Sequence, residues 1–297
     1  MSNRSWALVA ATVVALIYGV TFTVAKDVMP AYIEPYGFIL ARVAGSAILF
    51  WLIYFLIPNR QIALIDFPRI IVAAFFGVAF NMLTFFKGLS YTSPIMSAVL
   101  MVTTPIIVLV FSAILINEKL RLSKTTGILL GLIGTIVLII YGKSVGDASN
   151  AMWGNFLVFV NAASYAIYLI IVKKLMDKYN AFVFVPWIYT FGLLMVLPFG
   201  WDELMAVEWR LMPTDILLKT GFIVVVSTFL TYLLNLVSMR ELKPTTVAVF
   251  IYLQPLFATV FAVGLGKDDI NMVKIISTTL IFAGVYLVTK RNNTAQN

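Results

Sequence analysis

Two prolines occupy equivalent places near the middle of long apolar runs, Pro105 in the first half of the chain and Pro255 in the second. A proline inside a helix removes one backbone hydrogen bond and frees the carbonyl group four residues earlier, here at Met101 and Ile251. In chains that span a bilayer, paired helix breaks are typical of a central binding site. The spacing therefore predicts a site at this level, and bending for packing alone is the alternative.

Polar side chains inside apolar runs are the next candidates, because an unpaired polar group is costly in hydrocarbon. Arg42 is the only cation well inside such a run, and it could bind a carboxylate or phosphate, reach the interface or hydrogen-bond loop carbonyls. Asn235, closer to the end of its run, is a further amide. The other candidates could bind a small molecule or join helices: Tyr18, Asn81, Thr103, Thr104, Asn161, Tyr165, Tyr168, Trp187, Tyr189, Tyr252 and Gln254.

Several kinds of chemistry are excluded because the chain contains no histidine and no cysteine. His-dependent triads, His/Cys zinc sites, haem ligation and disulfides all require those residues. There is also no G-x-S-x-G elbow and no pair of carboxylates in the middle of an apolar run, which disfavours an intramembrane enzyme. We predict that the protein is not an enzyme and has no metal and no cofactor.

The composition indicates an all-α membrane protein: 62% of the 297 residues are hydrophobic, 11% are charged and the mean hydropathy is +1.00. A net charge of +8 fits basic cytoplasmic loops, so we do not expect a nucleic-acid partner. Ten runs are long enough to cross the bilayer, approximately residues 6–25, 35–57, 67–89, 92–116, 123–141, 152–172, 181–199, 217–238, 244–265 and 272–289.

Ten spans place both termini on the same side, and the distribution of Lys and Arg indicates which side. Of the 21 such residues, 13 lie in the segments on the N-terminal side and 7 on the other, with Arg42 inside a span. Because cytoplasmic loops collect cations, both termini are predicted to be cytoplasmic, in the cell inner (plasma) membrane.

The two halves, residues 1–145 and 146–297, are predicted to be related repeats. At an offset of 150 residues, the matching pairs are Pro94 with Pro244, Ala98 with Ala248, Pro105 with Pro255, Glu118 with Asp268 and Gly134 with Gly284. Five spans are an odd number, so the second repeat must enter the membrane from the opposite side. The expected architecture is therefore two inverted five-helix repeats.

The stretch Gly88-Leu89-Ser90-Tyr91-Thr92-Ser93-Pro94 and the positions above resemble an EamA-type transporter of the drug/metabolite transporter superfamily. The second half repeats the pattern from Glu241-Leu242-Lys243-Pro244, although Gly266-Lys267-Asp268 departs from it at the end of the span. Two further groups of residues match the family's pattern: Arg42 with Ala47 and Leu49, and Tyr18-Gly19 with Phe22.

The resemblance implies a secondary transporter that exports small metabolites. Amino acids, aromatic ones among them, are the expected cargo, and a carrier of nucleotide- or lipid-linked sugars is the alternative. All 13 acidic residues fall in predicted loops or at span ends, so no embedded carboxylate can bind a coupling ion, which favours a facilitator or exchanger. The expected partners are the small-molecule substrate and the lipid bilayer. Gly127, Gly131 and Gly134 are expected to pack within a monomer rather than across a homodimer.

Overall fold

The computed structural model describes residues 2–58, 61–91, 97, 100–118, 121–140, 151–264 and 272–290. Every regular element in these ranges is helical, and no strand occurs among them. The α-helices are α1 (Asn3–Val28), α2 (Pro35–Tyr54), α3 (Phe67–Ala74), α4 (Phe80–Tyr91), α6 (Thr104–Leu115), α7 (Leu122–Ile140), α8 (Ala151–Met176), α9 (Ala181–Met205), α10 (Thr214–Phe222), α11 (Thr231–Glu241), α12 (Pro244–Val249), α13 (Leu253–Gly264) and α14 (Met272–Thr289).

Short helical segments of other types join several of these. They are the 3₁₀ helices η1 (Leu64–Asp66) and η4 (Phe250–Tyr252) and the π-helices η2 (Phe75–Ala79) and η3 (Ile223–Leu230). The described residues contain seven helices long and apolar enough to cross a membrane and three shorter apolar ones. The all-helical prediction is confirmed in these ranges, and the count of ten spans stays a prediction.

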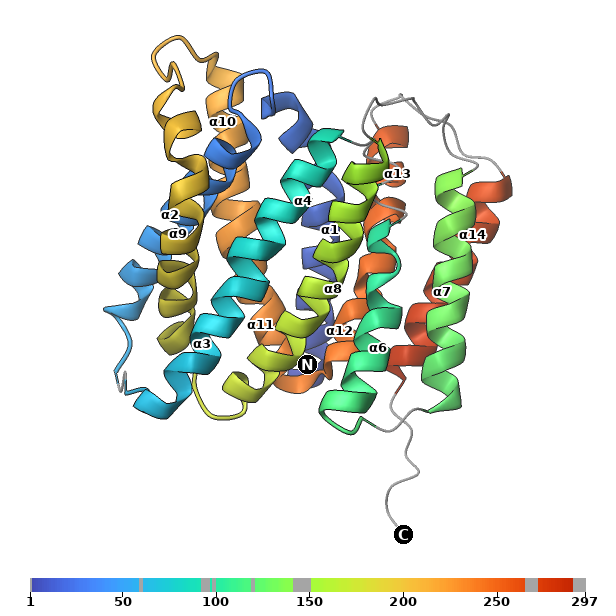
Figure 1. Cartoon of the computed structure of the whole chain (residues 1–297). Coiled ribbons are helices and arrows are strands. Elements are labelled where there is room, and N and C mark those ends of the chain that lie inside the picture. The colour runs from blue at the N-terminus through green and yellow to red at the C-terminus, as the bar shows by residue number, and fades with distance from the viewer. Residues whose placement is uncertain are drawn as a thin grey trace.

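The two halves of the chain are interleaved in one bundle (Figure 1). Each of α2–α9, α4–α8, α1–α11, α6–α8, α1–α13 and α7–α14 is a packed pair with one helix from each half. Replacing each helix by its counterpart in the other half reproduces these pairs: α1 corresponds to α8, for example, so α1–α11 corresponds to α8–α4. The two π-helices also occupy corresponding places, between α3 and α4 and between α10 and α11. This pattern is what a two-fold relation between repeats requires.

The start of α1 and the end of α14 lie at the same end of the bundle, opposite α10 (Figure 1). A side-chain nitrogen of Arg4, Nη2, donates a hydrogen bond to the Thr289 carbonyl oxygen at 2.7 Å. The contact joins the first and last helices of the described chain.

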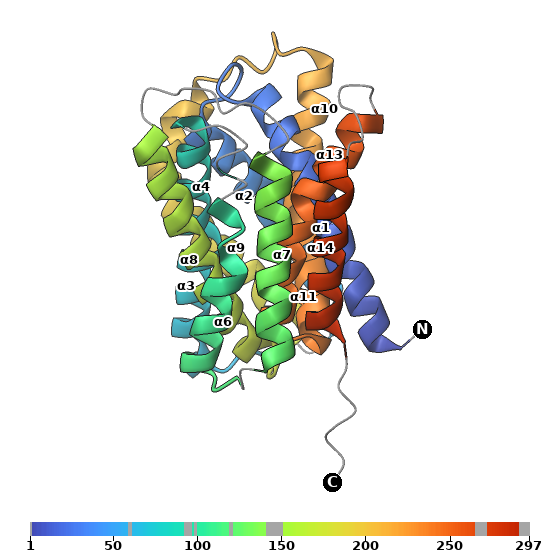
Figure 2. The same cartoon turned by 90° about the vertical axis from the view of Figure 1, so that its right-hand side faces the viewer.

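Small residues allow α7 and α14 to lie side by side (Figure 2). A Cβ atom on Gly127 would lie 2.8 Å from the Gly284 carbonyl oxygen, and one on Gly134 would lie 2.8 Å from that of Ser277. The predicted glycine contacts therefore lie inside one molecule. They leave the prediction of a monomer open, because a second copy could bind elsewhere.

Candidate functional site

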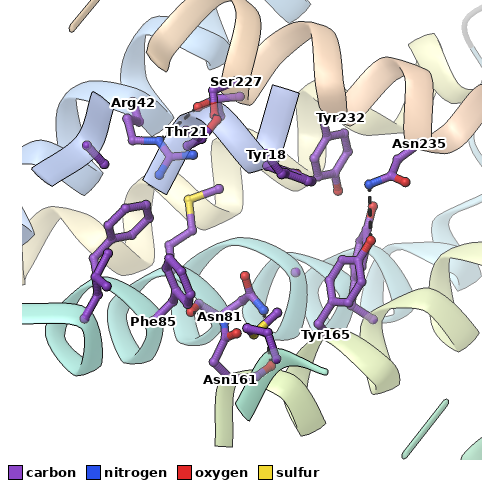
Figure 3. A pocket seen from close by; sticks show the side chains of 18 of the residues that line it. Tyr18, Thr21, Arg42, Asn81, Phe85, Asn161, Tyr165, Ser227, Tyr232 and Asn235 are labelled. Carbon is purple, nitrogen blue, oxygen red and sulfur yellow. Dashed lines mark hydrogen bonds between the residues drawn. The ribbon is translucent and has the colours of Figure 1, made fainter. Parts of the chain in front are cut away.

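A cavity of about 130 Å³ lies in the middle of the bundle, between helices of both halves (Figure 3). Its walls come from α1, α2, α4, α8, α9 and α11, from both π-helices and from the break that precedes α13. Nine of the side chains predicted from the sequence line it: Tyr18, Arg42, Asn81, Asn161, Tyr165, Tyr168, Tyr189, Asn235 and Gln254.

Four predicted residues are not among those that line this cavity. Thr103 uses its hydroxyl to donate to the Leu100 carbonyl oxygen at 2.7 Å, and Thr104 is fully buried. Trp187 packs against the aromatic ring of Trp51, with ring centroids 5.2 Å apart. Tyr252 is also fully buried, and a Cβ atom on the facing glycine, Gly131, would lie 2.3 Å from its ring. These four side chains take part in packing in this conformation.

The helix is interrupted just before each of the two prolines. Pro105 is the second residue of α6, after a turn at residues 102–103, and Pro255 is the third residue of α13, after the 3₁₀ helix η4. Met101 and Ile251, whose carbonyl groups the prolines were expected to free, both line the cavity. The paired breaks therefore flank the same internal space.

Arg42 is a buried cation with an incomplete set of hydrogen bonds. Only 4% of the residue is exposed, and its Nε donates to Thr228 Oγ1 at 2.9 Å. The guanidinium carbon lies 4.5 Å from the centroid of the Phe86 ring, which attracts the charge electrostatically. Nη1 has no hydrogen-bond partner in the described part of the protein. A buried cation with an unused donor favours an anionic ligand, because leaving it unpaired costs several kcal/mol.

The cavity lining that the structure describes contains no aspartate, glutamate or lysine. Salt bridges lie instead toward the ends of the bundle. Glu118 pairs with Lys124 at the end that carries the termini, and Lys219 pairs with Asp27 at 2.7 Å at the other end. The charge of Arg42 is therefore not balanced by an acidic side chain of the described lining.

Four tyrosines of the second half, Tyr165, Tyr168, Tyr189 and Tyr232, form a group in the cavity lining, and Tyr165 and Tyr232 lie in the part of the cavity away from Arg42 (Figure 3). Tyr232 contacts Tyr189 edge to face, with centroids 4.9 Å apart, and Tyr168 at 5.8 Å. The hydroxyl group of Tyr189 is buried without a hydrogen-bond partner in the described structure, and that of Tyr232 interacts with the Tyr168 hydroxyl. Asn235 Nδ2 donates to the Tyr165 hydroxyl at 3.2 Å. This group offers hydroxyl donors rather than charge.

Asn81 and Asn161 both line the cavity and join two helices. Asn161 Nδ2 donates to the Asn81 carbonyl oxygen at 2.7 Å, and Asn81 Nδ2 donates back to the Asn161 carbonyl oxygen at 3.4 Å. The bonds connect α4 of the first half to α8 of the second. The two roles considered from the sequence, lining a cavity and joining helices, thus occur together.

The sequence analysis missed four polar lining residues, Thr21, Ser227, Thr228 and Tyr232. Thr21 Oγ1 and Ser227 Oγ lie 2.7 Å apart and join α1 to η3. Their position inside apolar runs was an available signal. It is a weak one, because Ser and Thr in helices commonly bond to their own backbone.

Comparisons with known proteins match the chain to a transporter family. A model of the EamA-like transporter family matches residues 5–140 and again residues 152–290. An uncharacterized transporter of Archaeoglobus fulgidus is 25% identical over 289 residues, which is 97% of this chain and 99% of that one. The uncharacterized transporter YoaV of Bacillus subtilis is 27% identical over 282 residues, 93% of this chain and 94% of its own.

Two further matches concern location and fold. The uncharacterized inner membrane transporter YicL of Salmonella typhimurium is 25% identical over 241 residues, 80% of this chain and 76% of its own. A solved crystal structure superimposes with a TM-score of 0.76 over 96% of this chain and 98% of that one. At 18% sequence identity, that match bears on the fold alone.

Proposed function

Because the chain belongs to the EamA-like transporter family of the drug/metabolite transporter superfamily, and is a multi-pass membrane transporter, we propose that small carboxylate-bearing molecules cross the membrane through the central cavity. Arg42 carries this proposal. It is buried, has an unused donor, and faces a lining in which no acid is described. A carboxylate can accept from Nη1 while Nε remains bound to Thr228.

Amino acids, including aromatic ones, are the cargo class suggested by the sequence, and export across the inner membrane is the suggested direction. The aromatic walls support a ring-bearing cargo, since Phe85, Phe86 and the tyrosines line the same space. The relative YicL is named an inner membrane transporter, which supports the location. A nucleotide- or lipid-linked sugar is less well matched, because Arg42 is the only cation in the described lining.

The proposed mechanism is alternating access by two inverted five-helix repeats, residues 1–145 and 146–297, which form ten spans with both termini in the cytoplasm. The reciprocal helix pairs and the Arg4–Thr289 contact support this arrangement. Helices α1 and α4 end on the side opposite the termini, and the cavity residues Ala25 and Leu89 lie within three residues of those ends. Helix α11 ends on the side of the termini, and the cavity residue Asn235 lies six residues before that end. The cavity is thus nearer the end opposite the termini, which favours access from that side.

The absence of an acid from the described lining supports a facilitator or exchanger driven by the cargo's own gradient.

The proposed function is tested by measuring flux into proteoliposomes that contain the purified chain. The radiolabelled cargoes are the carboxylates L-phenylalanine and benzoate, each measured with and without an imposed proton gradient. We expect saturable flux of at least one of them that Arg42→Gln abolishes and that the proton gradient does not drive. Absence of Arg42-dependent flux of either compound would overturn the proposal.

A further inference from the structure

We infer that the cavity selects a monoanionic carboxylate of about one aromatic ring over a zwitterionic amino acid, and that the tyrosine end of the cavity binds a hydroxyl group of that cargo. The inference rests on the proposed function and narrows it. The proposed function requires only that the cargo carry a carboxylate. The charge and shape of the lining determine what else the cargo carries.

The charges of the cavity lining and of its cargo should balance inside the membrane. Arg42 can pair with one carboxylate, which gives a neutral complex inside the membrane. An amino acid also brings an ammonium group, and that group needs an anionic partner or strong acceptors when it leaves water. Of the 13 acids in the chain, those the structure describes lie at helix ends or between helices, and none lines the cavity. The described lining thus balances one negative charge and no positive one.

Aromatic rings can also hold an ammonium group, through the negative face of the ring. Here the four rings of the tyrosine group contact one another or Phe50. Tyr189 lies 4.6 Å from Phe50 and 4.9 Å from Tyr232, and Tyr165 is stacked on Tyr168 at 6.0 Å. Tyr232 itself contacts Phe50, Tyr168 and Tyr189. The tyrosine group is therefore packed as a ring cluster rather than as an open cage for a cation.

The tyrosine hydroxyls are what this cluster still offers to a ligand. The hydroxyls of Tyr189 and Tyr232 are buried; that of Tyr189 has no partner in the described structure, and that of Tyr232 has only the Tyr168 hydroxyl. Buried polar groups are normally satisfied, so these hydroxyls beside a cavity favour a ligand that can donate and accept hydrogen bonds there. Arg42 and the Tyr165–Asn235 pair lie toward opposite ends of the cavity (Figure 3). The cargo that fits this arrangement has a carboxylate at one end and a hydroxyl at the other.

The volume of the cavity limits the size of the cargo. At about 130 Å³ it is close to that of an apolar cavity of about 150 Å³ that holds benzene. The apolar part of its walls includes Met82, Phe86, Leu89 and Ile251. The cavity therefore holds a cargo of about one ring, and larger bodies do not fit without rearrangement.

The two helix breaks add positive potential in the same region. Both α6 and α13 are 12 residues long and begin beside the lining residues Met101 and Ile251. The N-terminal end of a helix carries partial positive charge, which favours an anion nearby. This adds to the charge of Arg42 in favouring an anion.

The experiment measures binding to the detergent-purified full chain at neutral pH, by thermal shift and by calorimetry. The probes are benzoate, its neutral analogue benzamide, its cationic analogue benzylamine, L-phenylalanine and 4-hydroxybenzoate. We expect benzoate to bind at least tenfold more tightly than benzamide, benzylamine and L-phenylalanine. We expect 4-hydroxybenzoate to bind about tenfold more tightly still, and Tyr232→Phe to reduce the ratio of its affinity to that of benzoate.

Arg42→Gln is expected to remove the preference for benzoate over benzamide. Arg69→Gln is the matched control, because it removes one arginine charge outside the cavity lining and should preserve the preference. The inference is wrong if L-phenylalanine binds as tightly as benzoate, if benzoate does not bind, or if its preference survives Arg42→Gln. Arg42-dependent flux of L-phenylalanine together with tight binding would overturn only this inference and leave the proposed function standing. If neither carboxylate shows Arg42-dependent flux with the wild-type protein, the proposed function is overturned.

Discussion

Arg42 and Thr228 join the two halves of the protein at the cavity: Nε of the arginine donates to Oγ1 of the threonine at 2.9 Å. The same hydroxyl donates to the Ile223 carbonyl oxygen, five residues earlier in the π-helix η3, at 2.7 Å. Because the hydroxyl proton is directed to the backbone, a lone pair faces the guanidinium group. The π-helix thus supplies the acceptor that holds one edge of Arg42 and leaves Nη1 for a ligand.

Thr228→Val should destabilise the protein and weaken carboxylate binding. Valine has nearly the same shape, but it leaves a buried charged donor without its acceptor, which costs about 1.5–3 kcal/mol. We expect a lower melting temperature and about tenfold weaker binding of benzoate, measured by thermal shift and calorimetry. Thr228→Ser keeps the hydroxyl and should stay close to the wild type. In an Arg42→Met background, the effect of Thr228→Val should largely disappear, and an undiminished effect there would contradict the pairing.

Arg42→Met should raise the melting temperature of the ligand-free protein while abolishing carboxylate binding. Burial of an arginine in a membrane costs roughly 2.5–3.5 kcal/mol. The hydrogen bond to Thr228 and the contact with Phe86 recover only part of this cost. We expect a net gain of about 1 kcal/mol, which thermal unfolding in detergent would detect as a rise of a few degrees. A fall in melting temperature would mean that Arg42 already has a compensating partner in the free protein.

The residues that could be identified from sequence are those that apolar surroundings penalise most. Arg42, Asn81 and Asn161 are costly in hydrocarbon wherever they point, so their presence inside apolar runs is informative by itself. All three line the cavity. Thr228 carried little such information, because a threonine can satisfy its hydroxyl with its own helix, and only the structure shows that this hydroxyl also accepts from Arg42.

The sequence also did not predict which face of a helix is turned toward the cavity. Trp187 and Tyr189 are two residues apart, which is about 200° around an α-helix, so they face nearly opposite sides of α9. The structure places Tyr189 in the cavity wall and Trp187 against Trp51 and Phe67. Composition alone could not choose between them, since both are large aromatic residues in the middle of one apolar run.

Gly77→Ala should change the shape of the cavity without changing its charge. A Cβ atom at this position would lie 2.2 Å from Cδ2 of Tyr168, so the ring must move. Both residues line the cavity, and we expect binding of ring-sized carboxylates such as benzoate to fall by at least tenfold in calorimetry. Gly221→Ala is the matched control: no atom lies within 4 Å of its Cβ position, and binding should be unchanged. Equal binding by both variants would mean that Tyr168 does not shape the site.

Lys124→Met should destabilise the end of the bundle that carries the termini. Glu118 is 6% exposed and accepts from Lys124 and, at 2.7 Å, from the Thr245 hydroxyl of the second half. Without the lysine, a buried carboxylate loses its cation, which costs about 3–5 kcal/mol. Thermal unfolding in detergent should show a marked fall in melting temperature for Lys124→Met and substantial recovery in the double variant Lys124→Met with Glu118→Leu. Failure of the second substitution to rescue would mean that Lys124 stabilises the protein by packing rather than by pairing.

Single cysteines can test the topology directly, because the natural chain has none. The contact between Arg4 and Thr289 holds the start of α1 and the end of α14 together, so Ser2→Cys and Lys290→Cys should lie on the same side of the membrane. The excess of Lys and Arg on that side predicts that it is the cytoplasmic side. A maleimide that cannot cross the membrane should therefore label Arg210→Cys in intact cells, and Ser2→Cys and Lys290→Cys only after the cells are opened. Labelling of Ser2→Cys and Lys290→Cys from opposite sides would exclude two inverted repeats of five spans each.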